Sequence, residues 1–122
     1  MKLMIVDDND QMRRLIRSFV TPLAEQIFEC SNGKEAVAAY ALHHPDWVLM
    51  DVEMNEMDGI TATLKIRQQF ANARILIVTQ YDDSEMRAAA RAAGALGYVL
   101  KDNLFELRKL LAVPLNSTGV GL

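Results

Sequence analysis

Four short apolar runs in the sequence are each followed directly by a side chain that can do chemistry. Those side chains are the carboxylates of Asp7, Asp8 and Asp51, the hydroxyl of Thr79 and the amine of Lys101. A carboxylate after one strand is usually only the N-cap of the next helix. Three acids, a hydroxyl and an amine at four strand ends indicate a shared site, because ligands of an open α/β sheet bind outside the carboxyl ends of its strands.

The types of these side chains indicate binding of a cation and a phosphoryl group. Asp7, Asp8 and Asp51 brought together would repel one another, so they require a positive partner. Mg²⁺ prefers oxygen ligands and commonly uses one or two carboxylates and a phosphate. Lys101 would add a compact ammonium charge, and Thr79 a hydroxyl for an anionic oxygen. One of the carboxylates could also accept the phosphoryl group covalently.

The elements that must position these side chains alternate along the chain. Five apolar runs predict strands, and they cover residues 3–6, 26–30, 47–50, 74–78 and 96–100. The segments between them have helical spacing. Helix starts are predicted where a capping residue precedes glutamate by three positions, at Asn32, Asp82 and Asn103. Strands that alternate with helices of this length predict an α/β fold with a parallel sheet.

Length and composition exclude several classes of protein. The 122 residues predict one domain over residues 1–115, with a flexible tail over residues 116–122 that could begin a linker. No apolar stretch is long enough for a membrane helix, so no membrane partner is expected. Cys30 is the only cysteine, which excludes a disulfide framework and makes a cytoplasmic setting the expectation. The net charge of −3 and the scattered basic residues argue against a nucleic-acid surface in this chain.

Four motifs resemble the receiver domain of bacterial two-component response regulators. They are IVDDN at 5–9, VLMDVEMNEMDG at 48–59, ILIVTQYDD at 75–83 and GALGYVLKDN at 94–103. The resemblance covers about residues 2–112, and TQYDD and GYVLKD are most similar to the NarL/LuxR-like subfamily. It implies a flavodoxin-like doubly wound (βα)5 domain whose five-stranded parallel sheet has the order 2-1-3-4-5.

The resemblance also implies the roles of individual residues in phosphoryl transfer. Asp51 matches the aspartate that accepts the phosphoryl group from a sensor histidine kinase. The ligands of the Mg²⁺ ion are matched by Asp7, Asp8, Asp51 and the backbone carbonyl of Glu53. Lys101 matches the lysine that pairs with the phosphoryl oxygens.

Two further pairs of residues have expected roles in the phosphorylated state, one in its switch and one in its lifetime. Thr79 matches a switch hydroxyl, and Tyr98 matches the aromatic side chain that turns inward when the threonine moves. Glu53 and Tyr81 are expected to flank the phosphoryl group, where they would tune the access of water.

The resulting expectation is a signalling domain that switches its surface to control an output. Its partners would be the histidine kinase and a second copy of the chain after phosphorylation, with DNA bound only through an output domain absent from this chain. It would catalyse its own phosphotransfer and dephosphorylation without being a metabolic enzyme. Three alternatives stay open: a stand-alone receiver acting by protein–protein interaction, a receiver-like module in which phosphorylation is irrelevant, and a small Mg²⁺-dependent phosphohydrolase.

Overall fold

The computed structural model describes residues 1–112, and its central feature is one sheet of five parallel strands. The strands are β1 Lys2–Val6, β2 Gln26–Cys30, β3 Trp47–Met50, β4 Ile75–Thr79 and β5 Gly97–Leu100. Their order is β2-β1-β3-β4-β5, which confirms the predicted flavodoxin-like doubly wound fold. The predicted tail at 116–122 and the expected domain end at residue 115 lie outside the described residues.

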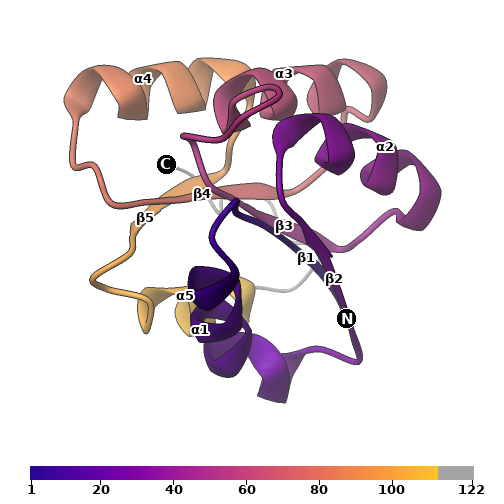
Figure 1. The fold of residues 1–122 in the computed structure, drawn as a ribbon. Helices are drawn as coiled ribbons and strands as arrows, with labels where there is room; N and C mark the ends of the chain where they lie inside the picture. Colours follow the sequence, from indigo (N-terminus) through magenta and orange to yellow (C-terminus); the bar gives the residue numbers. More distant parts are fainter. Residues whose placement is uncertain (113–122) are drawn as a thin grey trace.

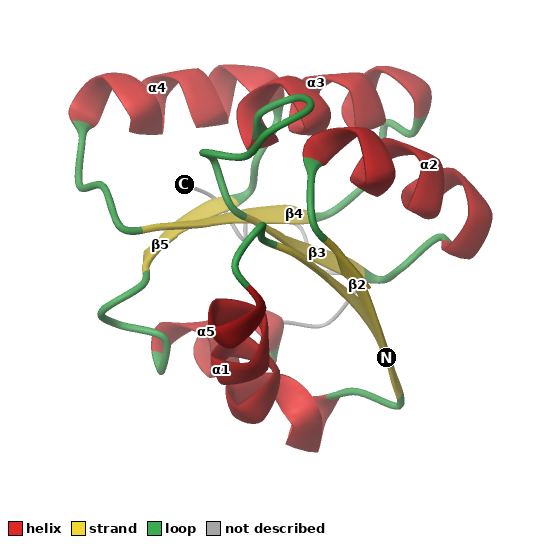
Figure 2. Cartoon of the chain, viewed as in Figure 1, coloured by secondary structure: helices red, strands yellow, loops and turns green. Residues whose placement is uncertain are grey.

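Five α-helices cover the two faces of this sheet (Figure 1). They are α1 Asp10–Val20, α2 Gly33–His43, α3 Gly59–Gln69, α4 Ser84–Ala93 and α5 Glu106–Leu111, and a 3₁₀ turn, η1 Thr21–Leu23, follows α1. α1 and α5 lie on one face, and α2, α3 and α4 lie on the other (Figure 2). Among residues 1–112, none of the helices has the length and apolar character needed to cross a membrane.

The central strands β3 and β4 are buried along their whole length, because helices cover both faces of the sheet. Successive residues of a strand point to opposite faces, so two apolar cores form. In β1, Met4 and Val6 belong to the core under α2, α3 and α4, whereas Leu3 and Ile5 belong to the core under α1 and α5. Trp47, at the start of β3, is fully buried in the second core.

Side-chain caps define the starts of four helices. The capping residues, which each accept a backbone N–H, are Asn9, Asn32, Asp58 and Asp83. The predicted start at Asp82 is wrong by one residue, because Asp83 has the extended backbone of a cap and accepts from Glu85. Asp82 instead pairs with Arg87. The predicted cap at Asn103 is also wrong: α5 begins at Glu106 without a side-chain cap, and Asn103 donates its amide N–H to the Glu106 carboxylate.

Candidate functional site

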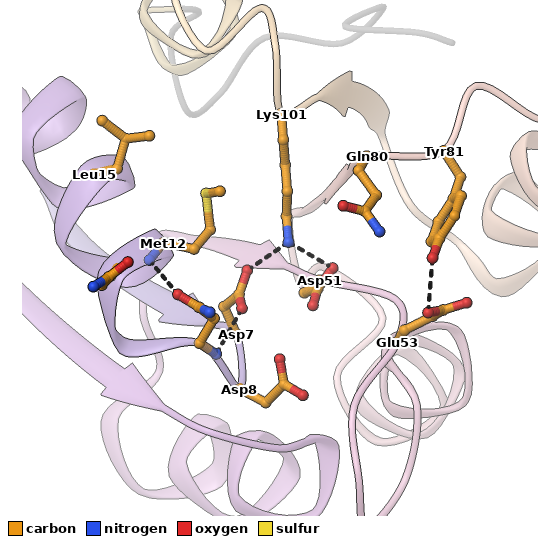
Figure 3. Close-up of a pocket in the computed structure, with 11 residues that line it drawn as sticks. Asp7, Asp8, Met12, Leu15, Asp51, Glu53, Gln80, Tyr81 and Lys101 are labelled. Carbon is orange, nitrogen blue, oxygen red and sulfur yellow. Dashed lines mark hydrogen bonds and ion pairs between the residues drawn. The ribbon is translucent and has the colours of Figure 1, made fainter.

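A pocket of about 520 Å³ lies at the carboxyl ends of the strands, beside the point where the strand order reverses between β1 and β3. It is lined by Asp7, Asp8, Asn9, Gln11, Met12, Leu15, Asp51, Glu53, Gln80, Tyr81 and Lys101. Figure 3 shows the side chains of Asp7, Asp51 and Lys101 converging at its centre. Of the predicted site residues, six therefore share the pocket, whereas Thr79 and Tyr98 are not among its lining residues.

Three aspartates meet in the pocket because β1 and β3 are neighbours in register. Val6 pairs with Met50, so the next residues, Asp7 and Asp51, leave the sheet side by side. The backbone N–H of Asp51 donates to the Val6 carbonyl over 2.9 Å. Carboxylate oxygens of Asp7, Asp8 and Asp51 lie within 4.8 Å of one another; Asp7 and Asp51 are buried and Asp8 is exposed.

Lys101 brings a positive charge to this acidic cluster from β5, the edge strand of the sheet. It directly follows β5, and its backbone N–H donates to the Thr79 carbonyl over 2.8 Å. Its Nζ lies 2.9 Å from Asp7 Oδ2 and 3.2 Å from Asp51 Oδ1. Burial acts to lower the pKa of Lys101, but the contacts with Asp7 and Asp51 outweigh it and the pKa is raised. The ammonium therefore stays charged beside the two carboxylates.

One lysine does not balance the charge of the cluster. Burial first, and the neighbouring Asp7 charge second, raise the pKa of Asp51 to about 6, against the opposing effect of Lys101. Asp7 Oδ2 is fully buried and, beyond its ion pair with Lys101, accepts no hydrogen bond from any residue in the range 1–112. Carboxylate oxygens are the ligands that Mg²⁺ prefers, so the residues present fit such an ion.

A chain of hydrogen bonds connects the pocket to β4 and β5. Tyr81 donates its hydroxyl to Glu53 Oε2 over 3.0 Å across one side of the pocket (Figure 3). Its backbone N–H donates to the hydroxyl of the buried Thr79 over 3.2 Å. Its carbonyl accepts the Tyr98 hydroxyl over 2.6 Å. The guanidinium of Arg87 lies over the Tyr98 ring, 4.4 Å from its centroid. Thr79 and Tyr98 are thus both connected to the pocket through Tyr81.

Two residues that support the site escaped the sequence analysis. A Cβ on Gly59 would lie 1.7 Å from the Asp51 carbonyl oxygen, so only glycine fits where α3 begins. Arg13 donates from Nη1 to the Asp7 carbonyl over 2.6 Å. The only signals for them were a glycine directly after the capping Asp58 and an arginine one turn into the helix that follows Asp7 and Asp8.

Fold and site together define a class of protein: a doubly wound α/β domain with an acidic pocket, completed by one lysine, at the carboxyl ends of its strands. Residues 3–112 match the family described as response regulator receiver domain. The chain therefore belongs to the receiver domains of two-component response regulators. Receiver domains of this family generally bind Mg²⁺ at an acidic pocket, and they interact with histidine kinases and phosphotransfer partners.

Individual relatives agree with this assignment. The chain is 41% identical over 104 residues to the uncharacterized transcriptional regulatory protein YhcZ of Bacillus subtilis, with 84% of this chain and 49% of that protein covered. It is 40% identical over 101 residues to the chemotaxis protein CheY of the same organism, with 82% and 84% covered. A crystal structure of a LuxR-family two-component response regulator from Aurantimonas sp. matches with a TM-score of 0.86 and 34% identity, over 93% of this chain and 84% of that one. The predicted NarL/LuxR-like affiliation is confirmed, and the chain spans about half the length of YhcZ.

Proposed function

We propose that Asp51 accepts a phosphoryl group from the phosphohistidine of a sensor histidine kinase. The observation that carries this proposal is the arrangement of charge around Asp51. Its carboxylate is buried, lies 3.2 Å from the Lys101 ammonium, and faces the Asp7 and Asp8 carboxylates in a pocket. With a pKa of about 6, Asp51 is mostly ionised at neutral pH and is available as a nucleophile.

The transfer moves one phosphoryl group from nitrogen to oxygen, and a proton from the solvent replaces it on the imidazole. An Asp51 oxygen attacks phosphorus in line with the leaving group, so that an O–P bond forms while the P–N bond of the phosphohistidine breaks. The electron pair of that bond returns to the imidazole nitrogen, which takes a proton from water. Lys101 pairs with the oxygens of the transferred group, where it stabilises negative charge in the transition state.

Asp7, Asp8, Asp51 and the backbone carbonyl of Glu53 would hold the Mg²⁺ ion. The bound ion supplies positive charge that neutralises the phosphoryl oxygens and the crowded carboxylates. Lys101 keeps Asp7 and Asp51 oriented toward the same point, since its Nζ contacts both.

The response to phosphorylation would run through Thr79 and Tyr98. A phosphoryl group on Asp51 attracts the Thr79 hydroxyl, and the Tyr98 ring responds through its hydrogen bond to the Tyr81 carbonyl. The side chains of Glu53 and Tyr81 are hydrogen-bonded to each other beside Asp51. They would limit the access of water and so set the lifetime of the phosphoryl group.

The output we propose is control of transcription through a DNA-binding domain outside this chain. Its support is the match to about half of the transcriptional regulatory protein YhcZ. The finer assignments belong to the same proposal: a receiver domain over residues 1–115, a linker starting in 116–122, a homodimer after phosphorylation, and a cytoplasmic setting. A second candidate, a stand-alone receiver that acts through protein contacts, is favoured by the match that covers 84% of the chemotaxis protein CheY.

Mass spectrometry after incubation with Mg²⁺ and a small phosphodonor tests the proposal. We expect one phosphoryl adduct on the wild type and none on Asp51→Asn, with Asp102→Asn, an exposed aspartate beside Lys101, behaving as the wild type. Absence of any adduct would favour a receiver-like module in which phosphorylation is irrelevant. Continuous turnover of free phosphate esters would favour a phosphohydrolase. Addition of a purified histidine kinase and ATP then tests the natural donor.

A further inference from the structure

We propose that Arg13 is a positioning residue of the acidic pocket: its guanidinium holds the backbone of Asp7 and thereby sets the direction of the Asp7 and Asp8 carboxylates. The inference rests on the proposed function, because it concerns how the same pocket receives a cation and a phosphoryl group. Arg13 does not line the pocket and would touch neither the cation nor the phosphoryl group.

The guanidinium of Arg13 joins three elements of the fold. Its Nη1 donates to the Asp7 carbonyl at the end of β1 over 2.6 Å. Its Nε donates to Glu29 Oε1 on the edge strand β2 over 3.0 Å, and its Nη2 pairs with Asp10 in the first turn of α1. The side chain is only 15% exposed. Three directional contacts on one planar group leave it little freedom to move.

The contact of Arg13 with the Asp7 carbonyl matters for the pocket because that carbonyl is part of the peptide unit between Asp7 and Asp8. The carbonyl of Asp7 and the N–H of Asp8 share one planar peptide unit, so fixing the oxygen fixes the plane from which the Asp8 side chain extends. Two other polar groups of Asp7 are also held: its N–H donates to the Cys30 carbonyl over 3.1 Å, and its Oδ1 accepts from the Asn9 N–H over 2.9 Å. Arg13 therefore completes the set of contacts that orient both acids.

The positive charge of Arg13 is matched outside the pocket. Glu29 and Asp10 each contribute a carboxylate to it, and Arg17 shares Glu29 through a contact of 2.7 Å to Oε2. Local pairing of this kind leaves little net charge to act on the acidic cluster. The geometry of the guanidinium, rather than its charge, is thus the property on which the pocket depends.

Arg17 provides a matched control on the same helix. It lies one turn further along α1 and binds the same glutamate, but its side chain is 45% exposed and its hydrogen bond goes to Glu29 rather than to Asp7. Arg17→Ala therefore removes the same charge and a contact with the same partner while it leaves the Asp7 carbonyl bound by Arg13.

The test measures cation affinity without phosphorylation, from the rise in melting temperature of each protein as Mg²⁺ is added. Residues that orient metal ligands typically change metal affinity by about 10- to 100-fold. We expect Arg13→Ala to need at least about tenfold more Mg²⁺ than the wild type to reach the same rise in melting temperature above its value in EDTA, and Arg17→Ala to need a concentration within about twofold of that of the wild type. Arg13→Lys, which keeps the charge but not the planar donor set, should recover less than half of the lost affinity on a logarithmic scale.

Three results would overturn the inference: a wild-type Mg²⁺ requirement in Arg13→Ala, an equal loss of Mg²⁺ affinity in Arg17→Ala, or full recovery of that affinity in Arg13→Lys, which would make the role one of charge. If Arg13→Ala shows no melting transition in EDTA, Arg13→Lys and Arg13→Gln carry the test: at least about a threefold weakening of Mg²⁺ affinity is expected for each, and a wild-type Mg²⁺ requirement would overturn the inference. The rate of adduct formation with the small phosphodonor is measured in parallel and should saturate at correspondingly higher Mg²⁺. A wild type that binds Mg²⁺ without forming an adduct would contradict the proposed function alone, since the melting data still decide the role of Arg13.

Discussion

Replacing Asp51 by asparagine should make the magnesium-free protein more stable at neutral pH, although it removes the group proposed to accept the phosphoryl group. The reason is the crowding of carboxylates at the ends of β1 and β3. Ionised Asp51 is buried beside Asp7, and Lys101 offsets this only in part. Asparagine has nearly the same shape as aspartate and carries no charge.

The magnitude follows from the pKa of Asp51. Burial, with a further contribution from Asp7, raises it from an ordinary value of 3.8 to about 6. At about 1.4 kcal/mol per pKa unit, this difference corresponds to about 3 kcal/mol of folding free energy lost when the group ionises. The attraction of Lys101 is already included in this pKa, and the amide of asparagine cannot make every contact of a protonated carboxyl group, so the expected gain in stability is about 1–3 kcal/mol.

The sign of the effect depends on pH. Because the folded pKa lies above the unfolded one, the proton on Asp51 stabilises the folded state fully below pH 3.8, and this stability is lost as the pH rises through about 6. The stability of Asp51→Asn relative to the wild type should therefore increase between about pH 4 and pH 6 and stay constant above that range.

Urea denaturation in EDTA at a series of pH values measures the effect, with Asp102→Asn as a control for loss of an exposed carboxylate. Saturating Mg²⁺ should reduce the advantage of Asp51→Asn, because the cation stabilises the wild type more. Equal or lower stability of Asp51→Asn in EDTA at pH 7.5, or a difference that does not change between pH 4 and pH 7, would refute the argument from carboxylate crowding.

Three further predictions concern the residues around Asp51. Gly59→Ala should lower the free energy of unfolding by about 2–3 kcal/mol and slow adduct formation, because its Cβ would lie 1.7 Å from the Asp51 carbonyl oxygen; stability within about 0.5 kcal/mol of the wild type in urea would contradict this. Asp58→Ala should cost about 1–2 kcal/mol at neutral pH through loss of the α3 cap. Burial acts to raise the pKa of Asp58, but its hydrogen bonds outweigh this effect and lower the pKa. The difference in the free energy of unfolding between Asp58→Ala and the wild type should therefore shrink as the pH falls below 3.8. A difference that stays constant in acid would speak against the cap. Tyr81→Phe loses only the hydrogen bond to Glu53. It should shorten the lifetime of the phosphoryl group by about two- to tenfold, with little change in melting temperature. An unchanged lifetime in a mass-spectrometric time course would exclude a role of Tyr81 in limiting the access of water.

The parallel sheet and the convergence of acids were predictable from the sequence because both follow from local patterns, whereas the strand order was implied by the resemblance to the receiver family. Apolar runs of four or five residues identify the strands, and a parallel sheet places all their carboxyl ends at one edge. The positions of Asp7, Asp51 and Lys101 followed directly from these two facts. Thr79 differs slightly from the expectation, since it is the last residue of β4 rather than the first residue after it.

Features that depend on contacts between distant segments were not predictable. Nothing in the spacing of Arg13 and Glu29 indicates that β2 lies against the start of α1, and this neighbourhood decides where the guanidinium points. The requirement for Gly59 likewise appears only when α3 is folded back over Asp51. Asp82 and Asp83 are adjacent aspartates and therefore equally suited to cap a helix by residue type. Only the extended backbone conformation at Asp83 selects it as the cap.

The burial of Trp47 at the start of β3 has a practical consequence for spectroscopy. Trp47 is the only tryptophan of the chain, and four residues of extended strand separate it from Asp51 by about 13 Å. The emission of its indole should therefore follow loss of the folded core but respond little to events in the acidic pocket. An optical probe of those events would need a fluorophore at the pocket itself. The partly exposed position of Tyr81, which lines the pocket beside Glu53, offers a place for one.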